Sequence, residues 1–600
     1  MPDIIIDKKA QGEFALGYKN FKLASYVYAY TLDKADEKQL QDGVDFMKRH
    51  TRLGKVYLET HRGLVDVPES KMLAAKELFQ RNGLEVAGGI TSTVLVGERK
   101  PSIFDCFCFS DEAHRQRYRQ IVEYTARLFD EIILDDYFFT PCRCEKCIEK
   151  KGSRSWERYR LDTMAEFSAE IAALAKEVNP KCKFVIKYPN WYESFQETGY
   201  DPERQRDIFD GIYTGTESRR SNYNPQHLQR YLSYSLIRLM ENTAPGRNGG
   251  GWIDLGGSNG NLSVWLEQAE LTLFAKAREL MLFNFESVCA STAIPPLGLA
   301  LERADKLLDH LGQPVGVPVY EPFNADGEDQ FYNYVGMCGI PLEPTPEFDG
   351  SQSSIFLTQN SARDPQVMDK LKKYVMNGGV AVVTSGFVRE TLGKGMEDMT
   401  SLRFTGRKAI GTKYQMTNLN VSSKHVVKSD EPVIFDILNH KNNATWPDVL
   451  LHLNDFCCSI LSEDMYGKGY LYILTVPDNF GDIYRFPREV WGAIAKDFSR
   501  GRKFFVTAEP KVNVFEYDND TFGVYSHQEY PTALEMTLLG EDYAGFEDIE
   551  SGEQFLTVHH LEPQPRRLGD CATCRPEPLE RVFRLPVYPG TYRFFRLIKA

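Results

Sequence analysis

The stretch EIILDDYFF at residues 131–139 has the apolar, β-branched composition of a buried strand. A helical segment from Trp156 to about Val178 follows it, and KFVIKYPNWY at 183–192 repeats the strand composition. Strand, helix and strand in this order form a βαβ unit, whose two strands lie parallel in one sheet. The number of such units therefore decides the fold.

Six further strands of the same kind flank this unit, at 23–31, 55–61, 84–93, 210–218, 249–257 and 279–287. The last helix, LALERADKLLDHLG, ends at Gly312. Eight β-then-α units in about 310 residues predict a (β/α)8 TIM barrel over 1–312, because both the count and the length fit. A doubly wound sheet would show a similar alternation, usually with fewer units.

The sequence changes character after the barrel. Gly and Pro in GQPVGVP mark a boundary at Gly312. Beyond it we predict an open α/β domain over 313–500, with strands at 353–360, 380–386 and 469–478. From Lys503 onward, short strands separated by turns predict a C-terminal antiparallel β-sandwich over 501–600.

The composition excludes several classes of protein. Of the 600 residues, 42% are hydrophobic and 26% charged, as in ordinary folded proteins. The net charge of −13 argues against a nucleic-acid partner, which needs a clustered basic face. No segment approaches the ~20 apolar residues of a membrane helix, and the start, MPDIIIDKK, has no cleavage pattern. We therefore expect no membrane partner and a cytoplasmic location.

In a (β/α)8 barrel the active site lies at the carboxyl ends of the strands. Acidic and aromatic residues dominate these positions, which suits sugar chemistry: glycosidic cleavage needs two carboxyl groups, and aromatic rings pack on a sugar face. For His61 a structural role is the simpler interpretation. We expect substrate contacts from Glu59, His61, Asp135, Tyr188, Asn190, Trp191, Arg219, Trp252 and Glu286.

Three carboxylates are candidates for the catalytic pair. Adjacent strand residues point to opposite faces, so we expect only one of Asp135 and Asp136 to face the barrel interior, and Asp136 lies nearer the mouth. Glu217 or Asp254 would supply the second carboxyl group. Each also has a structural interpretation: a loop cap for the Asp pair, a surface ion pair with Arg219 for Glu217, and a buried, hydrogen-bonded carboxylate for Asp254.

A cluster of cysteines points to a metal. Cys142, Cys144 and Cys147 form a CxCxxC run after the fourth strand, and Cys106 and Cys108 follow the third. Three close thiols and one distant thiol can hold a tetrahedral zinc, which with four protein ligands is structural. The fourth ligand is either Cys106 or Cys108, and reduced thiols without a metal are the alternative. A lone CxxC pair carries only a weak metal or redox prediction: Cys571 and Cys574.

These features together resemble the glycoside hydrolase family 42 β-galactosidases. The three regions are similar in order and rough size to that family's barrel, α/β trimerisation domain and small β-domain. The run Cys142–Cys147 looks like its structural zinc motif. The resemblance implies a zinc ion held by four cysteines and an amidotransferase-like middle domain that has lost its chemistry and mediates trimer contacts. We expect an exo-acting glycosidase whose substrate is an oligosaccharide or glycoside.

The catalytic motif departs from that family, in which strand four ends in Asn-Glu and strand seven carries a nucleophilic Glu. Here the matching residues are Asp135-Asp136 on strand four and, on strand seven, what looks like Asp254. Some α-glycosidase barrels place an Asp nucleophile on strand four and an acid/base carboxylate on strand six. Asp136 and Glu217 would fit those roles.

Two other classes of protein stay open. A non-catalytic carbohydrate-binding scaffold on a decayed barrel would explain the missing Asn-Glu motif. A metal-dependent barrel enzyme would need clustered His and carboxylate ligands at the strand ends, and among the barrel's histidines only His61 lies at such a position.

Overall fold

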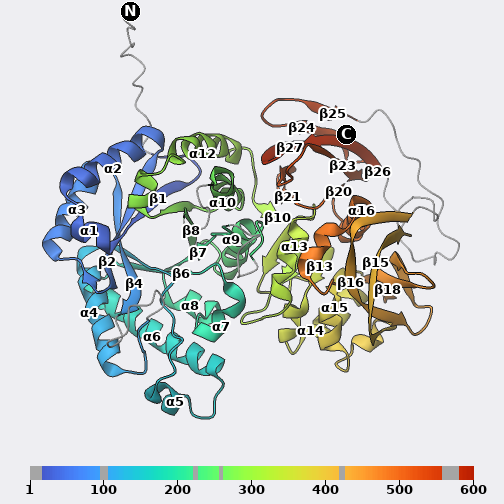
Figure 1. Cartoon of the computed structure of the whole chain (residues 1–600), viewed down its shortest axis with the longest axis horizontal. Coiled ribbons are helices and arrows are strands. Elements are labelled where there is room, and N and C mark those ends of the chain that lie inside the picture. The colour runs from blue at the N-terminus through green and yellow to red at the C-terminus, as the bar shows by residue number, and fades with distance from the viewer. Residues whose placement is uncertain (1–16, 95–105, 220–227, 256–260, 418–425, 557–579) are drawn as a thin grey trace, which may run out of the picture.

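The N-terminal region closes into a barrel of eight parallel strands, as predicted (Figure 1). The structure, a computed structural model, describes residues 17–94, 106–219, 228–255, 261–417, 426–556 and 580–600; Cys571 and Cys574 lie outside them. Pairing of the first barrel strand with both the last and the second completes the ring. The strands are β1 (Lys22–Val27), β2 (Leu53–Gly63), β4 (Glu85–Val94), β5 (Glu131–Leu134), β6 (Lys183–Tyr188), β7 (Gly211–Gly215), β8 (Asn248–Asp254) and β9 (Glu279–Phe283).

An outer layer of helices surrounds the barrel, and each helix buries an apolar stripe against the strands. Local signals fix several starts: Asp36 and Gln39 form a reciprocal capping box on α2, and the Ser155 side chain caps α6. The main helices are α2 (Glu37–His50), α3 (Glu69–Arg81), α4 (Glu112–Leu128), α6 (Trp156–Val178), α8 (Pro202–Ile208), α9 (Leu232–Thr243), α10 (Leu262–Phe274) and α12 (Ile294–Leu308).

The barrel interior is a packed core with charged groups at both ends. Its middle layer holds Tyr26, Tyr57, Tyr213 and Trp252 among smaller apolar side chains. At the amino end, the buried Lys55 Nζ contacts Glu131 Oε1 at 2.8 Å and Glu279 Oε2 at 3.3 Å. That network seals one end, so the other end is the one available for a site.

Several strands end earlier than the sequence predicts. Strand β5 ends at Leu134, before the predicted apolar run is complete, because Asp135 to Tyr137 turn across the barrel mouth. Strand β9 ends at Phe283, which places Glu286 on a short helix, α11 (Phe285–Cys289). Turns that follow the strands therefore contribute to the mouth together with residues at the strand ends.

The middle region contains a nine-stranded mixed sheet, larger than predicted. Its parallel half has the expected strands β13 (Ser354–Leu357), β14 (Val380–Thr384) and β19 (Gly469–Leu474), together with β11 (Val317–Tyr320) and β12 (Leu342–Thr345). An antiparallel extension absent from the prediction continues the sheet: β18 (Cys457–Tyr466), β17 (Thr445–His452), β15 (Leu402–Met416) and β16 (Val426–His440). Helices α14 (Val367–Met376), α15 (Ser385–Thr391) and α16 (Arg488–Phe498) complete this region.

The C-terminal region is the predicted β-sandwich. Its two sheets enclose a separate apolar core that includes Phe522, Leu534 and Phe595. The larger sheet contains β10 (Pro314–Val315), β21 (Val512–Tyr517), β22 (Thr521–Ser526), β27 (Thr591–Lys599), β24 (Tyr543–Asp548) and β25 (Gln554–Leu556). The smaller one contains β20 (Phe504–Thr507), β23 (Thr532–Leu539) and β26 (Glu580–Val587).

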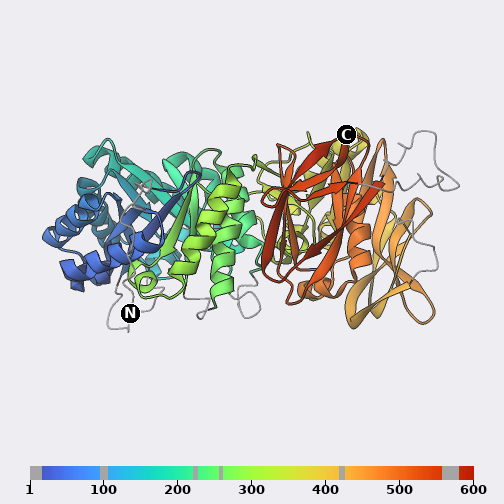
Figure 2. The ribbon, with the colours of Figure 1, turned by 90° about the horizontal axis from the view of Figure 1, so that it is seen from above.

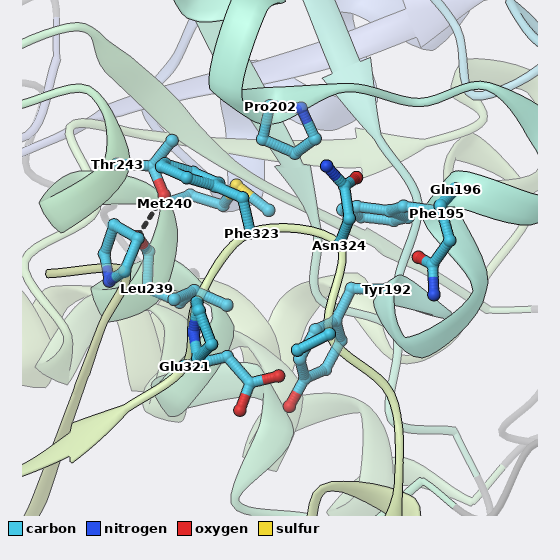
Figure 3. Close-up of a pocket in the computed structure, with 13 residues that line it drawn as sticks. Tyr192, Phe195, Gln196, Pro202, Leu239, Met240, Thr243, Glu321, Phe323 and Asn324 are labelled. Atoms are coloured by element: carbon cyan, nitrogen blue, oxygen red, sulfur yellow. Dashed lines mark hydrogen bonds between the residues drawn. The ribbon is translucent and has the colours of Figure 1, made fainter. Parts of the chain in front are cut away.

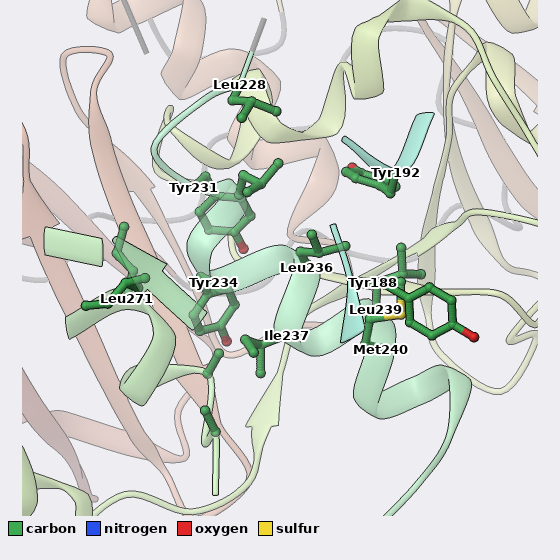
Figure 4. Packing of buried hydrophobic residues seen from close by; sticks show 14 of the residues in the cluster. Tyr188, Tyr192, Leu228, Tyr231, Tyr234, Leu236, Ile237, Leu239, Met240 and Leu271 are labelled. Carbon is green, nitrogen blue, oxygen red and sulfur yellow. The ribbon is translucent and has the colours of Figure 1, made fainter. Parts of the chain in front are cut away.

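Helix α9 joins the barrel to the other two regions. The barrel lies at one end of the elongated molecule, and the middle and C-terminal regions lie at the other (Figure 2). Tyr231, Tyr234 and Ile237 of this segment are buried in one continuous cluster (Figure 4). Tyr234 stacks near Phe515 of β21 with ring centroids 4.7 Å apart. Both faces of α9 are therefore internal.

Candidate active site

A buried lysine lies at the centre of the barrel mouth. Lys187, near the end of β6, is 1% exposed, and its ammonium nitrogen contacts three carboxylates. The distances are 2.8 Å to Asp136 Oδ2, 3.5 Å to Asp135 Oδ1 and 3.5 Å to Glu217 Oε1. Burial alone would lower the pKa of Lys187, but these carboxylates outweigh burial and raise it. Lys187 is therefore a permanent cation held between acids.

Asp135 is locked in place by cations and a hydroxyl group. Its Oδ2 accepts from Arg62 at 2.9 Å and from Thr91 Oγ1 at 3.1 Å. Burial would raise the pKa of Asp135, but Lys187 and Arg62 hold it below its usual range. Asp135 is 2% exposed, and both of its oxygens have partners. It is therefore an ionised group that positions Lys187 and Arg62.

Asp136 is the accessible carboxylate of the adjacent pair. Its side chain is 23% exposed and its pKa is raised, first by burial and then by the Asp135 charge, against the opposing effect of Lys187. The expectation that only one of the two carboxylates faces the interior is wrong. Because β5 ends at Leu134, the pair lies in a turn and both carboxylates reach the same ammonium group.

Glu217 lies directly across Lys187, in the segment that follows β7. It is 3% exposed, and its Oε2 has no hydrogen-bond partner in the described part of the chain. Burial, reinforced by Asp254 and Asp136 against the effects of Lys187 and Arg219, raises the pKa of Glu217 to about 7. Gly215 leaves room for it, since a Cβ there would lie 2.7 Å from Glu217 Oε2.

Arg219 pairs with Asp254 rather than forming a surface pair with Glu217. The Arg219 guanidinium donates to Asp254 Oδ2 at 2.9 Å, and the Asp254 side chain is 14% exposed at the end of β8. Both groups lie at the rim on the Glu217 side. Because Arg219 and Asp254 are both partly exposed, a molecule bound in the mouth could contact them.

The predicted aromatic residues divide into three environments. Trp252 is buried inside the barrel, and the Lys187 ammonium lies 4.2 Å from its ring centroid, so it forms a floor below the mouth. Trp191 is partly exposed beside Phe139. Tyr188 does not line the mouth: it packs behind the sheet, where its hydroxyl group donates to Gln205 of α8. Period-two alternation turns Lys187 inward and Tyr188 outward.

Three other predicted residues are buried and have defined partners. Asn190 is buried, and its Nδ2 donates to the Glu217 carbonyl at 2.7 Å, so it fixes the Glu217 backbone. Glu59 is fully buried and accepts from the Ala29 amide and from Arg62. His61 contacts Asp66 and the Thr93 carbonyl, as a structural histidine would.

Glu286 is exposed on α11 and accepts from Thr31 Oγ1 at 2.8 Å. None of its interactions in the described structure involves Lys187.

Lys187, Arg62 and Thr91 are the site residues absent from the sequence prediction. A signal existed for Lys187, because a lysine within the otherwise apolar KFVIKY must find buried partners. Arg62 gave no local signal, since it reaches the mouth from an extension of β2 past Glu59. The predicted site therefore contained the carboxylates of the mouth but lacked two of the cations that neutralise them.

Four thiols gather beside the mouth as a possible metal centre. The Sγ atoms of Cys108, Cys142, Cys144 and Cys147 all lie within 4.8 Å of one another. Cys108 is 3.6 Å from both Cys144 and Cys147, and those two are 3.7 Å apart. The cluster connects the segment after β4 to the segment after β5, as expected. Cys106 is outside it and forms a β-bridge with Thr93, so Cys108 is the upstream member.

Comparison with known proteins supports a glycosidase architecture. Residues 11–295 match the family described as "Probable glycosyl hydrolase, catalytic domain", and residues 312–479 match the second domain of the uncharacterized protein SSO3021. That protein, from Saccharolobus solfataricus, is 28% identical over 397 residues, which cover 60% of this chain and 65% of the relative. Among the described residues, no helix has the length and apolar character needed to cross a bilayer.

Solved structures share the fold over nearly the whole chain. A β-galactosidase from Rahnella sp. R3 superposes with a TM-score of 0.62 at 12% identity, covering 97% of this chain and 99% of its own. α-L-Fucosidase isoenzyme 2 from Paenibacillus thiaminolyticus gives 0.62 at 10% identity, covering 97% and 100%. The chain therefore shares the fold of the family 42 β-galactosidases, and its residues 11–295 match a glycosyl hydrolase catalytic-domain family.

Proposed function

We propose that the chain is an exo-acting glycoside hydrolase that removes a terminal sugar from an oligosaccharide or glycoside. The observation that carries this proposal is the contact of both Asp136 and Glu217 with the Lys187 ammonium at the barrel mouth. Two carboxyl groups in unlike environments are what glycosidic cleavage requires. The glycosyl hydrolase match over residues 11–295 supports the same class of reaction.

The environments assign different roles to the two acids. Burial raises the pKa of both acids, but Asp136 lies closer to the Lys187 cation and is more exposed than Glu217, so we assign Asp136 as the ionised nucleophile. Glu217 is more buried, has a pKa raised to about 7 and keeps one oxygen unpartnered among the described residues, so it is the proton donor. Asp135 keeps its charge and holds Lys187 in place.

The separation of the two acids favours double displacement. One oxygen of each acid contacts the same nitrogen, at 2.8 and 3.5 Å, so these two oxygens are at most roughly 6.3 Å apart. We therefore propose the close spacing of retaining enzymes, ~5–5.5 Å between carboxyl groups, rather than the ~6.5–9.5 Å of inverting enzymes. Asp136 would attack the anomeric carbon while Glu217 protonates the departing oxygen. Glu217 would then take a proton from water, which attacks the same carbon and releases Asp136.

The remaining mouth residues would bind the sugar. Arg219 and Asp254 offer donors and acceptors to hydroxyl groups, and Trp191 offers a ring face. Substitution of any of these three side chains should weaken substrate binding more than it lowers the turnover rate of bound substrate.

We also propose that the four thiols hold a structural zinc. Zn–S bonds of ~2.3 Å in a tetrahedron place sulfurs about 3.8 Å apart. The distances of 3.6 and 3.7 Å among Cys108, Cys144 and Cys147 fit that spacing, and the Cys142 sulfur lies within 4.8 Å of all three. Four cysteines would fill the coordination sphere, so the metal would hold two loops together and take no part in catalysis. One zinc per chain by elemental analysis tests this.

The quaternary structure and location extend the proposal. We propose a trimer formed through 313–500, supported by the resemblance to family 42. Region boundaries near 312 and 500 are supported by the division into four sheets: one in the barrel, one in the middle region and two in the C-terminal region. A cytoplasmic location is supported by the ten described cysteines, none of which forms a disulfide bond. Light scattering coupled to size exclusion tests the trimer.

A non-catalytic sugar-binding protein is the second candidate. The end of strand four favours this candidate, because this chain has Asp135-Asp136 where family 42 has Asn-Glu and so lacks that glutamate. The test is a panel of aryl glycosides of both anomers with Asp136→Asn and Glu217→Gln as controls. Release from one substrate that both substitutions abolish supports the enzyme; silence together with measurable sugar binding supports the second candidate.

A further inference from the structure

A cavity lies between the barrel and the middle region, and its lining includes neither Lys187 nor the carboxylates around it (Figure 3). Its volume is about 40 Å³, room for ~3 water molecules. The segment after β6, helix α9 and the segment after β11 enclose it. Its walls are mostly apolar and aromatic: Tyr192, Phe195, Leu239, Met240, Phe323 and Pro202.

A buried acid lies at one end of this cavity. Glu321 is 5% exposed; its Oε1 accepts from Asn360 Nδ2 at 2.7 Å, and its Oε2 has no hydrogen-bond partner among the described residues. Figure 3 shows its carboxylate near the hydroxyl end of Tyr192. The charged groups that act on it are acidic, Glu193 and Asp326, and burial with these neighbours raises the pKa of Glu321 to about 8.

Two other acceptors in the cavity also lack donors. Gln196, 4% exposed, and Asn324 line the cavity, and the side-chain oxygen of each has no partner in the described structure. Arg206 is not one of the lining residues, although its guanidinium lies 5.0 Å from the Phe323 ring centroid and donates to the Thr243 carbonyl. The lining side chains therefore carry no positive charge, and none of the described donors reaches the three unpartnered oxygens, which belong to Glu321, Gln196 and Asn324.

We propose that this cavity binds a small organic ammonium ion, with the Glu321 carboxylate as its counter-ion and the rings of Tyr192 and Phe195 as its walls. An ammonium group supplies N–H donors to unpartnered oxygens, and aromatic faces attract cations while accommodating attached carbon. A divalent metal suits the cavity less well. Among the described residues, only the cysteine cluster brings three or more metal-ligating groups of His, Cys, Asp or Glu together.

The test is binding of methylammonium, ethanolamine and tetramethylammonium to the full chain, by calorimetry and thermal unfolding at pH 8. Potassium and calcium chlorides at equal ionic strength serve as salt controls. We expect saturable binding of at least one ammonium ion, with a rise in unfolding temperature at ~10 mM ligand that the salts do not give. Glu321→Gln, which keeps the side-chain shape, should weaken binding at least ~10-fold.

Glu193→Gln is the matched control, because Glu193 acts on Glu321 but accepts from the Gly327 amide outside the cavity lining. It should change ammonium affinity less than ~3-fold. Binding should also strengthen from pH 6 to pH 8 in the native chain and not in Glu321→Gln, a readout that a folding defect does not imitate. No saturable binding by any ammonium ion, or equal binding by Glu321→Gln, would overturn the proposal.

Discussion

The ammonium nitrogen of Lys187 lies 2.8 Å from Asp136 Oδ2, inside a mouth that also holds Asp135 and Glu217. The same nitrogen touches Glu217 Oε1, so a change of charge on either acid acts on the other through one cation. Such groups titrate as a unit. In the proposed mechanism the acid nearer to Lys187 loses its proton first, so that the two carboxyl groups take opposite roles.

Glu217→Gln should remove the proton donor and leave the fold intact. We expect kcat/KM on a glycoside with a poor leaving group to fall ~10²–10⁴-fold. A dinitrophenyl glycoside, whose leaving group needs no proton, should lose much less in the first step. Equal losses on both substrates would contradict the role of Glu217 as acid.

The pH profile of the native enzyme follows from the same residue. Glu217 must be protonated at the start of the reaction and its pKa is about 7, so kcat/KM should decline as pH rises through that value. The decline should vanish for the dinitrophenyl glycoside. A profile flat from pH 6 to pH 9 on both substrates would contradict the assignment.

Asp136→Asn should abolish turnover on every leaving group, because it removes the nucleophile rather than the acid. The expected loss is several orders of magnitude at unchanged circular dichroism. Asp254→Asn is the matched control: it removes a rim carboxylate paired with Arg219, so mainly KM should rise. Native activity in Asp136→Asn would refute the catalytic pair.

Lys187→Met should destabilise the protein by about 3–5 kcal/mol, because it leaves buried carboxylates uncompensated. Without the cation, the folded-state pKa values of Asp136 and Glu217 rise further above their unfolded values. Stability from such groups is lost as pH rises through the folded pKa. Urea unfolding should therefore show a larger deficit at pH 8 than at pH 5, whereas Lys183→Met, exposed at the other end of β6, should show little change at either pH.

Cys108→Ser should remove the bound metal, and Cys106→Ser should keep it, because only Cys108 lies within the thiol cluster. Elemental analysis of both variants, with thermal unfolding alongside, checks this. We expect about one zinc per chain in the native protein and in Cys106→Ser. Zinc retained at full occupancy in Cys108→Ser would show that the zinc is bound at another site.

The sequence predicted the barrel well because most of its strands are short runs of apolar residues and several connecting helices begin at a capping side chain. It predicted the mouth less well. The composition of EIILDDYFF does not reveal that strand β5 ends at Leu134. The next residue, Asp135, contacts Arg62, which lies 73 positions away in the sequence. The sequence prediction also placed Tyr188 of β6 in the mouth, whereas its side chain points outward to Gln205 and the neighbouring Lys187 points inward.

The missed strands have a different cause. Strand β15, LRFTGRKAIGTKYQM, exposes many of its residues and carries glycine and lysine, so neither alternation nor an apolar run marks it. Its position depends on pairing with β16 and β17, contacts that close only in the folded sheet. Local composition cannot report long-range pairing of that kind.

Helix α9 has a consequence for how the chain can be divided. Tyr234 and Ile237 belong to one apolar cluster that extends from the barrel into β21, and Arg238 reaches across to Glu343 of the middle sheet at 2.7 Å. A barrel cut at residue 312 would expose this tyrosine-rich surface to water and leave a buried guanidinium without its carboxylate. The barrel half is thus not a detachable module, and shuffling it onto other scaffolds would require redesign of α9.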